Sequence, residues 1–175
     1  MEIEEWRGVP GFEHRYQVSS LGRIRSYGAD SHKRILKGIT LPRGYKLLNA
    51  RGNGKSTWFK VHRLVFETFV RKLEAGEVLD HIDRDQTNNA VKNLRACSRS
   101  ENNYNSRPRK NKKSRYKGVC WNGKTSRWVV KIKANKKAHY VGVFRCEHEA
   151  ACAYNKKALE LHGEFAYLNE VGGRL

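Results

Sequence analysis

Residues 78–95 read VLDHIDRDQTNNAVKNLR, and Asn102 follows shortly after. Two apolar residues lead into Asp80 and His81, and the stretch then becomes rich in Asp and Asn, whose side chains bond nearby backbone and hold irregular turns. We expect a short strand that ends at His81, then an Asn-rich loop, then a helix from about Ser98. Because neighbours on an extended strand point to opposite sides, Asp80 and His81 can serve one site only if the strand ends or bulges there.

These side chains suit the hydrolysis of a phosphodiester. That reaction needs an activated water, charge stabilisation on the phosphate and help for the departing 3′ oxygen. A histidine can take the proton of the water near neutral pH, and a hard divalent cation can neutralise the phosphate and the leaving oxygen. Carboxylate and amide oxygens suit Mg²⁺ or Mn²⁺ better than zinc. The plain alternative is that the Asp and Asn residues only shape a turn.

The chain around this stretch is strongly basic. It holds 36 Lys and Arg against 17 Asp and Glu, a net charge of +19. Residues 107–145 alone hold 14 Lys and Arg and no Asp or Glu, which is a charge of +14. Such a charge favours a polyanionic partner. No apolar run approaches the roughly 20 residues that span a bilayer, so we expect nucleic acid and no membrane.

Upstream of the opening stretch, residues 1–60 are typical of short strands. One predicted pair flanks a Leu21-Gly22 turn, and a second pair, near 45–48 and 57–61, flanks the Gly- and Asn-containing loop 51–55. Residues 62–70 carry apolar side chains at helical spacing and predict a helix. For His62, at its start, packing or a backbone contact is favoured over catalysis.

Downstream, residues 106–115 contain no apolar side chain and are interpreted as a basic linker. Three strands are expected near 117–121, 127–133 and 138–144, followed by a helix near 147–162 with a stripe of small residues that suits packing against a sheet. The predicted fold class is therefore α+β, with small modules: a β-rich module at 1–60, a core at 61–105, the linker, and a sheet-plus-helix module at 116–170.

The central stretch resembles the HNH nuclease motif of phage and intron homing endonucleases, a ββα-metal fold. The resemblance rests on four features taken together: Asp80-His81, Asn88-Asn89, Asn93-Leu94 and Asn102 at their spacing. It implies that His81 is the general base, that Asp80 and Asn102 hold one Mg²⁺ or Mn²⁺ ion, and that Asn93 fixes the loop and orients His81. Asn102 stands where many of these enzymes carry a last histidine.

Two further segments resemble DNA-binding elements. Residues 6–13 (WRGVPGFE) and 16–26 (YQVSSLGRIRS) resemble the NUMOD4 motif, which implies DNA contact by Arg23 and Arg25 on the face opposite Ile24. A solvated strand face is the plain alternative for these arginines.

Residues 114–169 resemble the AP2 DNA-binding domain through six segments of sequence. These are YKGV (116–119), RWVVKIK (127–133), YVGVF (140–144), EAA (149–151), AYN (153–155) and HGEFAYLN (162–169). Strand alternation puts Lys131 and Lys133 on one face with Arg127, and such a basic face can enter the major groove. The candidate DNA contacts are Lys117, Arg127, Lys131, Lys133 and Tyr140. A solvated charged face is the alternative.

The resemblances together imply a site-specific endonuclease that acts on double-stranded DNA as a monomer. One active site in each monomer predicts a nick in one strand. A phage-encoded enzyme of this kind would work in the cytoplasm of the bacterial host. Two other readings stay open: a non-catalytic DNA-binding regulator with a degenerate nuclease module, and an RNA-binding protein.

Overall fold

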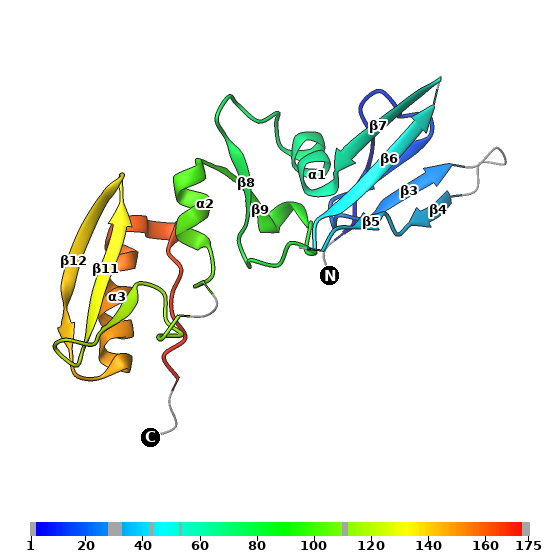
Figure 1. Cartoon of the computed structure of the whole chain (residues 1–175). Helices are drawn as coiled ribbons and strands as arrows, with labels where there is room; N and C mark the ends of the chain where they lie inside the picture. The colour runs from blue at the N-terminus through cyan, green and yellow to red at the C-terminus, as the bar shows by residue number, and fades with distance from the viewer. Residues whose placement is uncertain (1–2, 28–32, 43, 53, 110–111, 173–175) are drawn as a thin grey trace. The chain divides into compact units, whose positions relative to one another are not determined.

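The computed structural model describes residues 3–27, 33–42, 44–52, 54–109 and 112–172 of the chain. The chain forms two compact units, Met1–Ser98 and Arg99–Leu175, and each is described by itself. Both combine antiparallel sheets with helices, so the α+β class is confirmed (Figure 1). None of the helices among the described residues has the length and apolar character needed to cross a bilayer.

The first unit opens with a four-stranded antiparallel meander. Its strands are β1 (Trp6–Gly8), β2 (Tyr16–Ser19), β3 (Ile24–Tyr27) and β4 (Lys33–Leu36). The predicted turn at Leu21-Gly22 joins β2 to β3, and Gly22 adopts φ +79, a conformation that a glycine adopts without strain. Val18 and Ile24 face the core from these two strands. The sequence did not indicate β1 or β4, which are short strands without a clear alternation.

A second sheet and a helix complete the scaffold of this unit. The sheet consists of β5 (Ile39–Thr40), β6 (Lys46–Gly52) and β7 (Lys55–Lys60), and the helix α1 (Val61–Phe69) follows directly. The hairpin expected around residues 51–55 is confirmed by the pairing of β6 with β7, although residue 53 lies outside the described residues. α1 contacts strands of both sheets and contributes Val61, Leu64 and Val65 to their shared core (Figure 1).

The opening stretch of the sequence forms a small antiparallel ribbon beside α1. β8 (Val78–His81) pairs with β9 (Leu94–Cys97), and the 3₁₀ turn η1 (Val91–Asn93) leads into β9. The strand ends at His81, as the residue pattern predicted. Arg84 turns the chain back with φ +65, and its N–H donates to the carbonyl of His81 at 2.9 Å.

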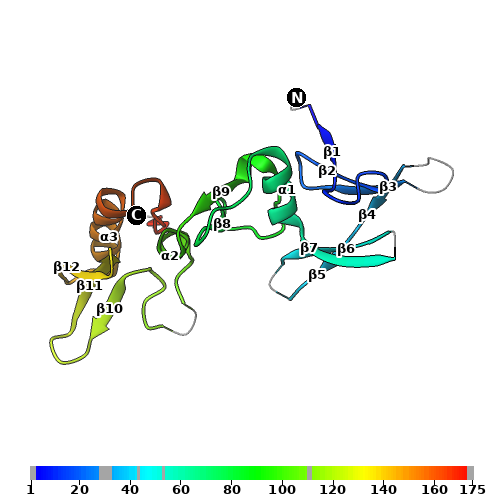
Figure 2. The ribbon, with the colours of Figure 1, turned by 90° about the horizontal axis from the view of Figure 1, so that it is seen from above.

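The second unit is a three-stranded sheet with one long helix across it. After α2 (Arg99–Asn105) come β10 (Val119–Asn122), β11 (Arg127–Ala134), β12 (Lys137–Phe144), α3 (Glu147–His162) and η2 (Gly163–Phe165). α3 lies along one face of the sheet (Figure 2). Its buried alanines and Tyr154 allow the close approach that the small-residue stripe predicted. The three predicted strands and the helix near 147–162 are therefore confirmed.

Gly118 shows how close this packing is. It adopts φ +78, and a Cβ built there would lie 2.1 Å from the Tyr154 ring. The boundary between the units falls after Ser98, so α2 belongs to the second unit, together with the sheet of β10, β11 and β12. The sequence analysis had instead grouped α2 with the core at residues 61–105. The four-part division of the chain stays a prediction.

Candidate active site

His81 is the last residue of β8, and only 5% of it is exposed. Its Nε2 lies 3.2 Å from Oδ1 of Asn89. The amide of Asn89 is oriented by its Nδ2, which donates to the carbonyl of Thr87 at 3.2 Å. Because an amide oxygen can only accept, Nε2 carries the hydrogen when the imidazole is neutral, and the lone pair is on Nδ1. The site therefore presents a histidine of defined tautomer.

Asn93 organises the loop that follows His81. Its Oδ1 accepts from the Asp83 N–H at 3.0 Å, and its Nδ2 donates to Asp83 Oδ1 at 2.9 Å and to the Asn88 carbonyl at 2.8 Å. The Asn93 carbonyl accepts from the Ile82 N–H at 2.9 Å. The sequence assigned the orientation of His81 to Asn93. The side chain that bonds the imidazole is Asn89, which the sequence offered only as a motif position.

Asp83 is the centre of the hydrogen bonds within this loop. Its partial burial acts to raise its pKa. The hydrogen bonds from the Asp85 N–H, from Asn88 and from Asn93 together outweigh burial, so the pKa of Asp83 lies below its ordinary value. Asp83 is therefore ionised at neutral pH, and its charge holds the loop closed.

Asp80 precedes His81 in β8. It is 4% exposed and stands opposite Arg95 in the register of β8 and β9. Nε and Nη2 of Arg95 donate to Oδ2 of Asp80 at 2.9 and 2.8 Å. A buried carboxylate needs such a partner, because removing an unpaired charge from water is costly. The sequence did not single out Arg95, since only the strand register brings it to Asp80.

A second histidine lies beside the first. The ring centroids of His62 and His81 are 5.3 Å apart, and the ring of Tyr45 lies 5.1 Å from His62 and 6.1 Å from His81. Burial, followed by the nearby charges of His81, Lys60 and Arg63, lowers the pKa of His62 to about 4. His62 is therefore neutral at pH 7.

Asn102 lies half-buried in α2, in the other unit. Its role beside Asp80 stays a prediction from the motif. Among the residues that the structure describes, no group of three or more His, Cys, Asp or Glu is placed to hold a metal ion.

The two N-terminal arginines are engaged within their own unit. Arg23 is exposed and pairs with Glu4. Arg25 lies with its guanidinium carbon 4.0 Å from the centre of the Trp6 ring, and its Nε donates to Gln17 at 2.8 Å. Both side chains lie near the surface, and their contact with DNA stays a prediction.

The outward face of the C-terminal sheet carries most of the candidate DNA contacts. Lys131 and Lys133 are exposed on β11, and Tyr140, 62% exposed, stands opposite Lys131 on β12. Arg127 is half-buried at the start of β11. A shallow hollow of about 580 Å³ lies on this face, and its walls include Cys120, Val129, Lys131 and Tyr140. The alternation of β11 predicted this basic face correctly, because the opposite positions are buried under α3.

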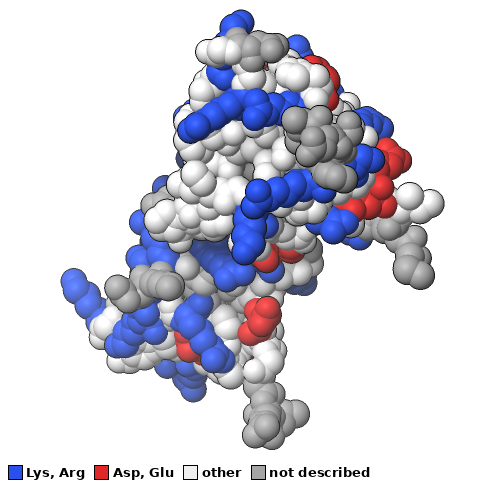
Figure 3. Space-filling view, turned by 90° about the vertical axis from the view of Figure 1, so that its right-hand side faces the viewer, with Lys and Arg blue, Asp and Glu red and all other residues white. Residues whose placement is uncertain are grey.

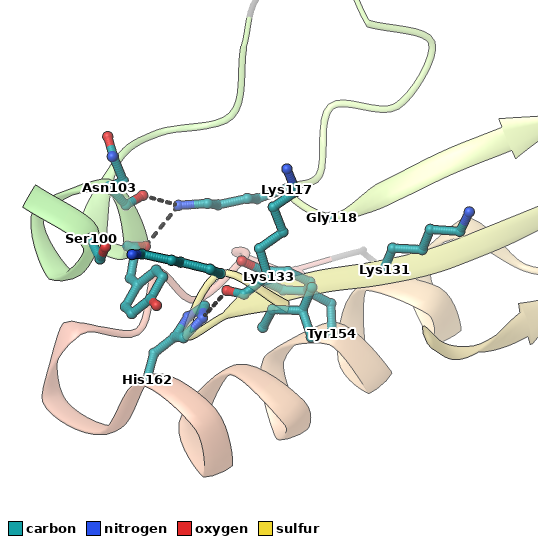
Figure 4. A pocket seen from close by; sticks show the side chains of 11 residues that line it. Ser100, Asn103, Lys117, Gly118, Lys131, Lys133, Tyr154 and His162 are labelled. Carbon is teal, nitrogen blue, oxygen red and sulfur yellow. Dashed lines mark hydrogen bonds between the residues drawn. The ribbon is translucent and has the colours of Figure 1, made fainter. Parts of the chain in front are cut away.

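Lys117 has a different environment from the other candidates. Its Nζ donates to the carbonyls of Asn103 (3.0 Å), Tyr104 (2.7 Å) and Ser106 (2.7 Å) at the end of α2 (Figure 4). These carbonyls lie at the C-terminal end of α2, where the helix dipole is negative, and the Asn103 carbonyl also accepts from the Ser106 N–H at 3.2 Å. The ammonium of Lys117 thus has a structural role inside the unit that the sequence did not indicate.

A pocket of about 340 Å³ lies beside this contact, between α2 and the sheet (Figure 4). Tyr104 stacks on His162 at its wall, with ring centroids 3.7 Å apart and planes 5° apart. The hydroxyl of Tyr104 accepts the N–H of Asn135 at 3.0 Å. α2 is therefore fixed within its unit by the Lys117 ammonium, by a ring stack on His162 of α3 and by a bond from the turn between β11 and β12.

Lys and Arg dominate the charged side chains on the face of the molecule shown in Figure 3. Acidic groups are fewer there. The surface potential is therefore positive over a broad area, which favours approach of a polyanion.

Two protein-family models match the chain. The model described as an HNH endonuclease matches residues 59–104, and the NUMOD4 motif matches residues 4–51. A solved structure titled "DNA binding and cleavage by the HNH homing endonuclease I-HmuI" superposes with a TM-score of 0.51 at 38% identity, covering 58% of this chain and 56% of that one.

Curated proteins from phages are similar as well. DNA endonuclease I-HmuI of Bacillus phage SP01 is 38% identical over 91 residues, 52% of this chain and 51% of that protein. Protein 3.8 of Escherichia phage T7 is 31% identical over 105 residues, 60% of this chain and 86% of that protein. The chain thus spans about half the length of I-HmuI and most of the length of the T7 protein.

Proposed function

This chain belongs to the family of HNH homing endonucleases, and on that premise we propose that it is a site-specific endonuclease that nicks one strand of double-stranded DNA. The observation that carries the proposal is the pair of buried side chains at the end of β8. Asn89 bonds His81 and Arg95 bonds Asp80, so both side chains are held in place. A held histidine and a held carboxylate suit hydrolysis of a phosphodiester.

His81 is the general base in this proposal. The bond from Nε2 to Asn89 leaves Nδ1 as the nitrogen with the lone pair, so Nδ1 takes the proton of the attacking water. Asn89 then stabilises the imidazolium, because its oxygen keeps accepting from Nε2 when both nitrogens are protonated. Asn93 holds the loop that carries Asn89, through its bonds to Asp83 and Asn88.

Asp80 and Asn102 are the proposed ligands of one Mg²⁺ or Mn²⁺ ion. A carboxylate and an amide oxygen are hard donors that fit such an ion, which is commonly held by one or two protein groups plus water and substrate phosphate. When bound, the ion would neutralise charge on the phosphate and the leaving 3′ oxygen. Arg95 orients Asp80, since two of its N–H groups bond one carboxylate oxygen.

Two binding modules would flank the nuclease core, residues 61–105. The NUMOD4-like module, residues 1–60, would contact DNA through Arg23 and Arg25. The AP2-like module, residues 116–170, would place its sheet in the major groove and use Arg127, Lys131, Lys133 and Tyr140, with Lys117 limited to a phosphate contact. The basic linker 106–115 joins them. Linked weak modules raise the effective concentration of each other on one duplex, so a monomer suffices.

The phage relatives support an enzyme that is phage-encoded and works in the host cytoplasm. A supercoiled plasmid that carries the native locus tests the activity. We expect open-circular product with Mg²⁺, none with EDTA and none with His81→Ala. His14→Ala, which removes an exposed histidine of the same unit, serves as the matched control. Linear product would indicate paired action on both strands. Binding in a gel shift without any product would favour the non-catalytic regulator.

A further inference from the structure

Three aromatic rings meet at the base of the candidate active site, and they come from three separate elements. Tyr45 immediately precedes β6, His62 lies in the first turn of α1, and His81 ends β8. All three pairs of rings are in contact: the centroids lie 5.1 Å (Tyr45 and His62), 5.3 Å (His62 and His81) and 6.1 Å (Tyr45 and His81) apart. Such tilted and edge-on arrangements are the favourable ones for aromatic pairs.

A hydrogen bond at one nitrogen does not by itself fix an imidazole. The χ2 torsion of histidine is broad and roughly two-fold, so the ring can rock, or flip to exchange nitrogens for carbons. A flip of His81 would move Nδ1 away from the water that it must deprotonate. The tautomer set by Asn89 is therefore useful only if something else holds the plane of the ring.

His62 is well placed to do this. It is 8% exposed, and α1 anchors it between Val61 and the core residue Val65, both fully buried. Its ring stands at 64° to that of His81. A helix side chain in such packing has little freedom, so its ring forms a rigid wall against which the other imidazole rests.

We propose that His62, backed by Tyr45, is a positioning residue that holds the imidazole ring of His81 in the orientation that catalysis requires. This inference rests on the proposed function of His81 as the base. The packing of the ring is what matters, so a ring without nitrogens should serve at position 62.

The charge state of His62 is compatible with this role. Burial, with His81, Lys60 and Arg63 nearby, lowers its pKa to about 4, so it stays neutral when His81 gains a proton. A cationic neighbour at this distance would oppose that protonation. Nδ1 of His62 is also buried without a hydrogen-bond partner among the described residues, so loss of the nitrogen removes no bond of that atom.

Kinetics on the chain with both of its units test the proposal. With the supercoiled plasmid as substrate, His62→Ala should lower kcat by about 10- to 100-fold with little change in KM, as expected for a misplaced base. His62→Phe keeps a ring and should restore kcat to within about threefold. Val9→Ala, a fully buried residue of the same core that has no assigned role at the site, controls for destabilisation and should lower Tm while leaving kcat of the folded fraction near that of the wild type.

An NMR measurement separates this proposal from the proposed function. The ring protons of His81, assigned by their loss in His81→Ala, should be shifted by the neighbouring rings, and they should move and broaden in His62→Ala but not in Val9→Ala. This readout needs no cutting, so a wild type that fails to cut would refute the proposed function alone. Unchanged His81 signals in His62→Ala, or a kcat in His62→Phe as low as in His62→Ala, would overturn the positioning role.

Discussion

Gly22 links the turn between β2 and β3 to the partner of the proposed base. A Cβ at this position would lie 2.7 Å from the Asn89 Cβ and 2.8 Å from its carbonyl carbon and oxygen. Most of these atoms belong to backbone and cannot swing away. Gly22→Ala should therefore displace Asn89, and with it the hydrogen bond that sets the tautomer of His81.

The size of the effect follows from the geometry. Carbon atoms pack comfortably at about 3.5 Å or more, so Asn89 and the turn must separate by about 0.7 Å. The alanine also inherits φ +79, which costs about 1–2 kcal/mol for a residue with a Cβ. Overpacking adds about 1–3 kcal/mol. A displacement approaching 1 Å can lower a rate by about 100-fold, so we expect a loss of about 10- to 100-fold in kcat.

Gly11→Ala is the matched control, because Gly11 has φ +77 and no atom within 4 Å of a built Cβ. It bears the same backbone strain without the collision. Both variants are compared by thermal denaturation and by plasmid nicking at a temperature where both are folded. Gly22→Ala should lose more stability and most of its activity, whereas Gly11→Ala should cut normally. Equal activity of the two folded variants would refute the dependence of His81 on the turn.

Four further changes give measurable outcomes. Lys117→Met should lower the free energy of unfolding by about 1–2 kcal/mol in denaturant titrations, because the carbonyls at the end of α2 lose their cation; an unchanged value would show that these bonds do not stabilise the unit. Lys131→Ala with Lys133→Ala should weaken DNA binding and reduce the slope of log affinity against log salt by up to about 2, and an unchanged slope would remove both from the phosphates. Arg95→Met should cost about 3 kcal/mol in thermal unfolding, since it removes one side of the buried Arg95–Asp80 ion pair, and a neutral result would mean that this ion pair does not stabilise the fold. His62 has a folded pKa of about 4 against an ordinary value of 6.5, so its contribution to stability is present above pH 6.5 and is lost as the pH falls towards 4; His62→Phe should flatten this part of a Tm-against-pH profile.

Local patterns predicted the elements well, and for a physical reason. The end of β8 at His81, the helix α1 and the succession from β10 to α3 are encoded in periodicity and turn residues that lie within the element itself. The basic face of β11 could likewise be predicted, because alternation needs only the strand. The interpretation of residues 106–115 as a linker falls partly on residues 110–111, which lie outside the described part of the chain.

The partners of the site residues could not be predicted in this way. Arg95 reaches Asp80 only through strand register, and His62 reaches His81 only because α1 packs beside the ribbon. Asn89 and Asn93 are the same residue type four positions apart, so composition could not decide which bonds the imidazole and which closes the loop. These assignments depend on contacts between distant segments, which a single sequence does not specify.

Those contacts also change what the N-terminal module is for. The turn after β2 does more than present arginines: the Ser20 carbonyl accepts the Val91 N–H at 2.8 Å, and Gly22 lies against Asn89. Both contacts reach the loop that orders the proposed base, and α1 shares one core with β2 and β6. A nuclease core cut out at residue 61 would lose that support and a large part of its apolar core. The NUMOD4-like module is therefore part of the scaffold of the proposed active site. Deleting the module would both remove its DNA contacts and disorder the site, and the two effects could not be told apart. Single substitutions such as Gly22→Ala are the sharper experiment for this reason.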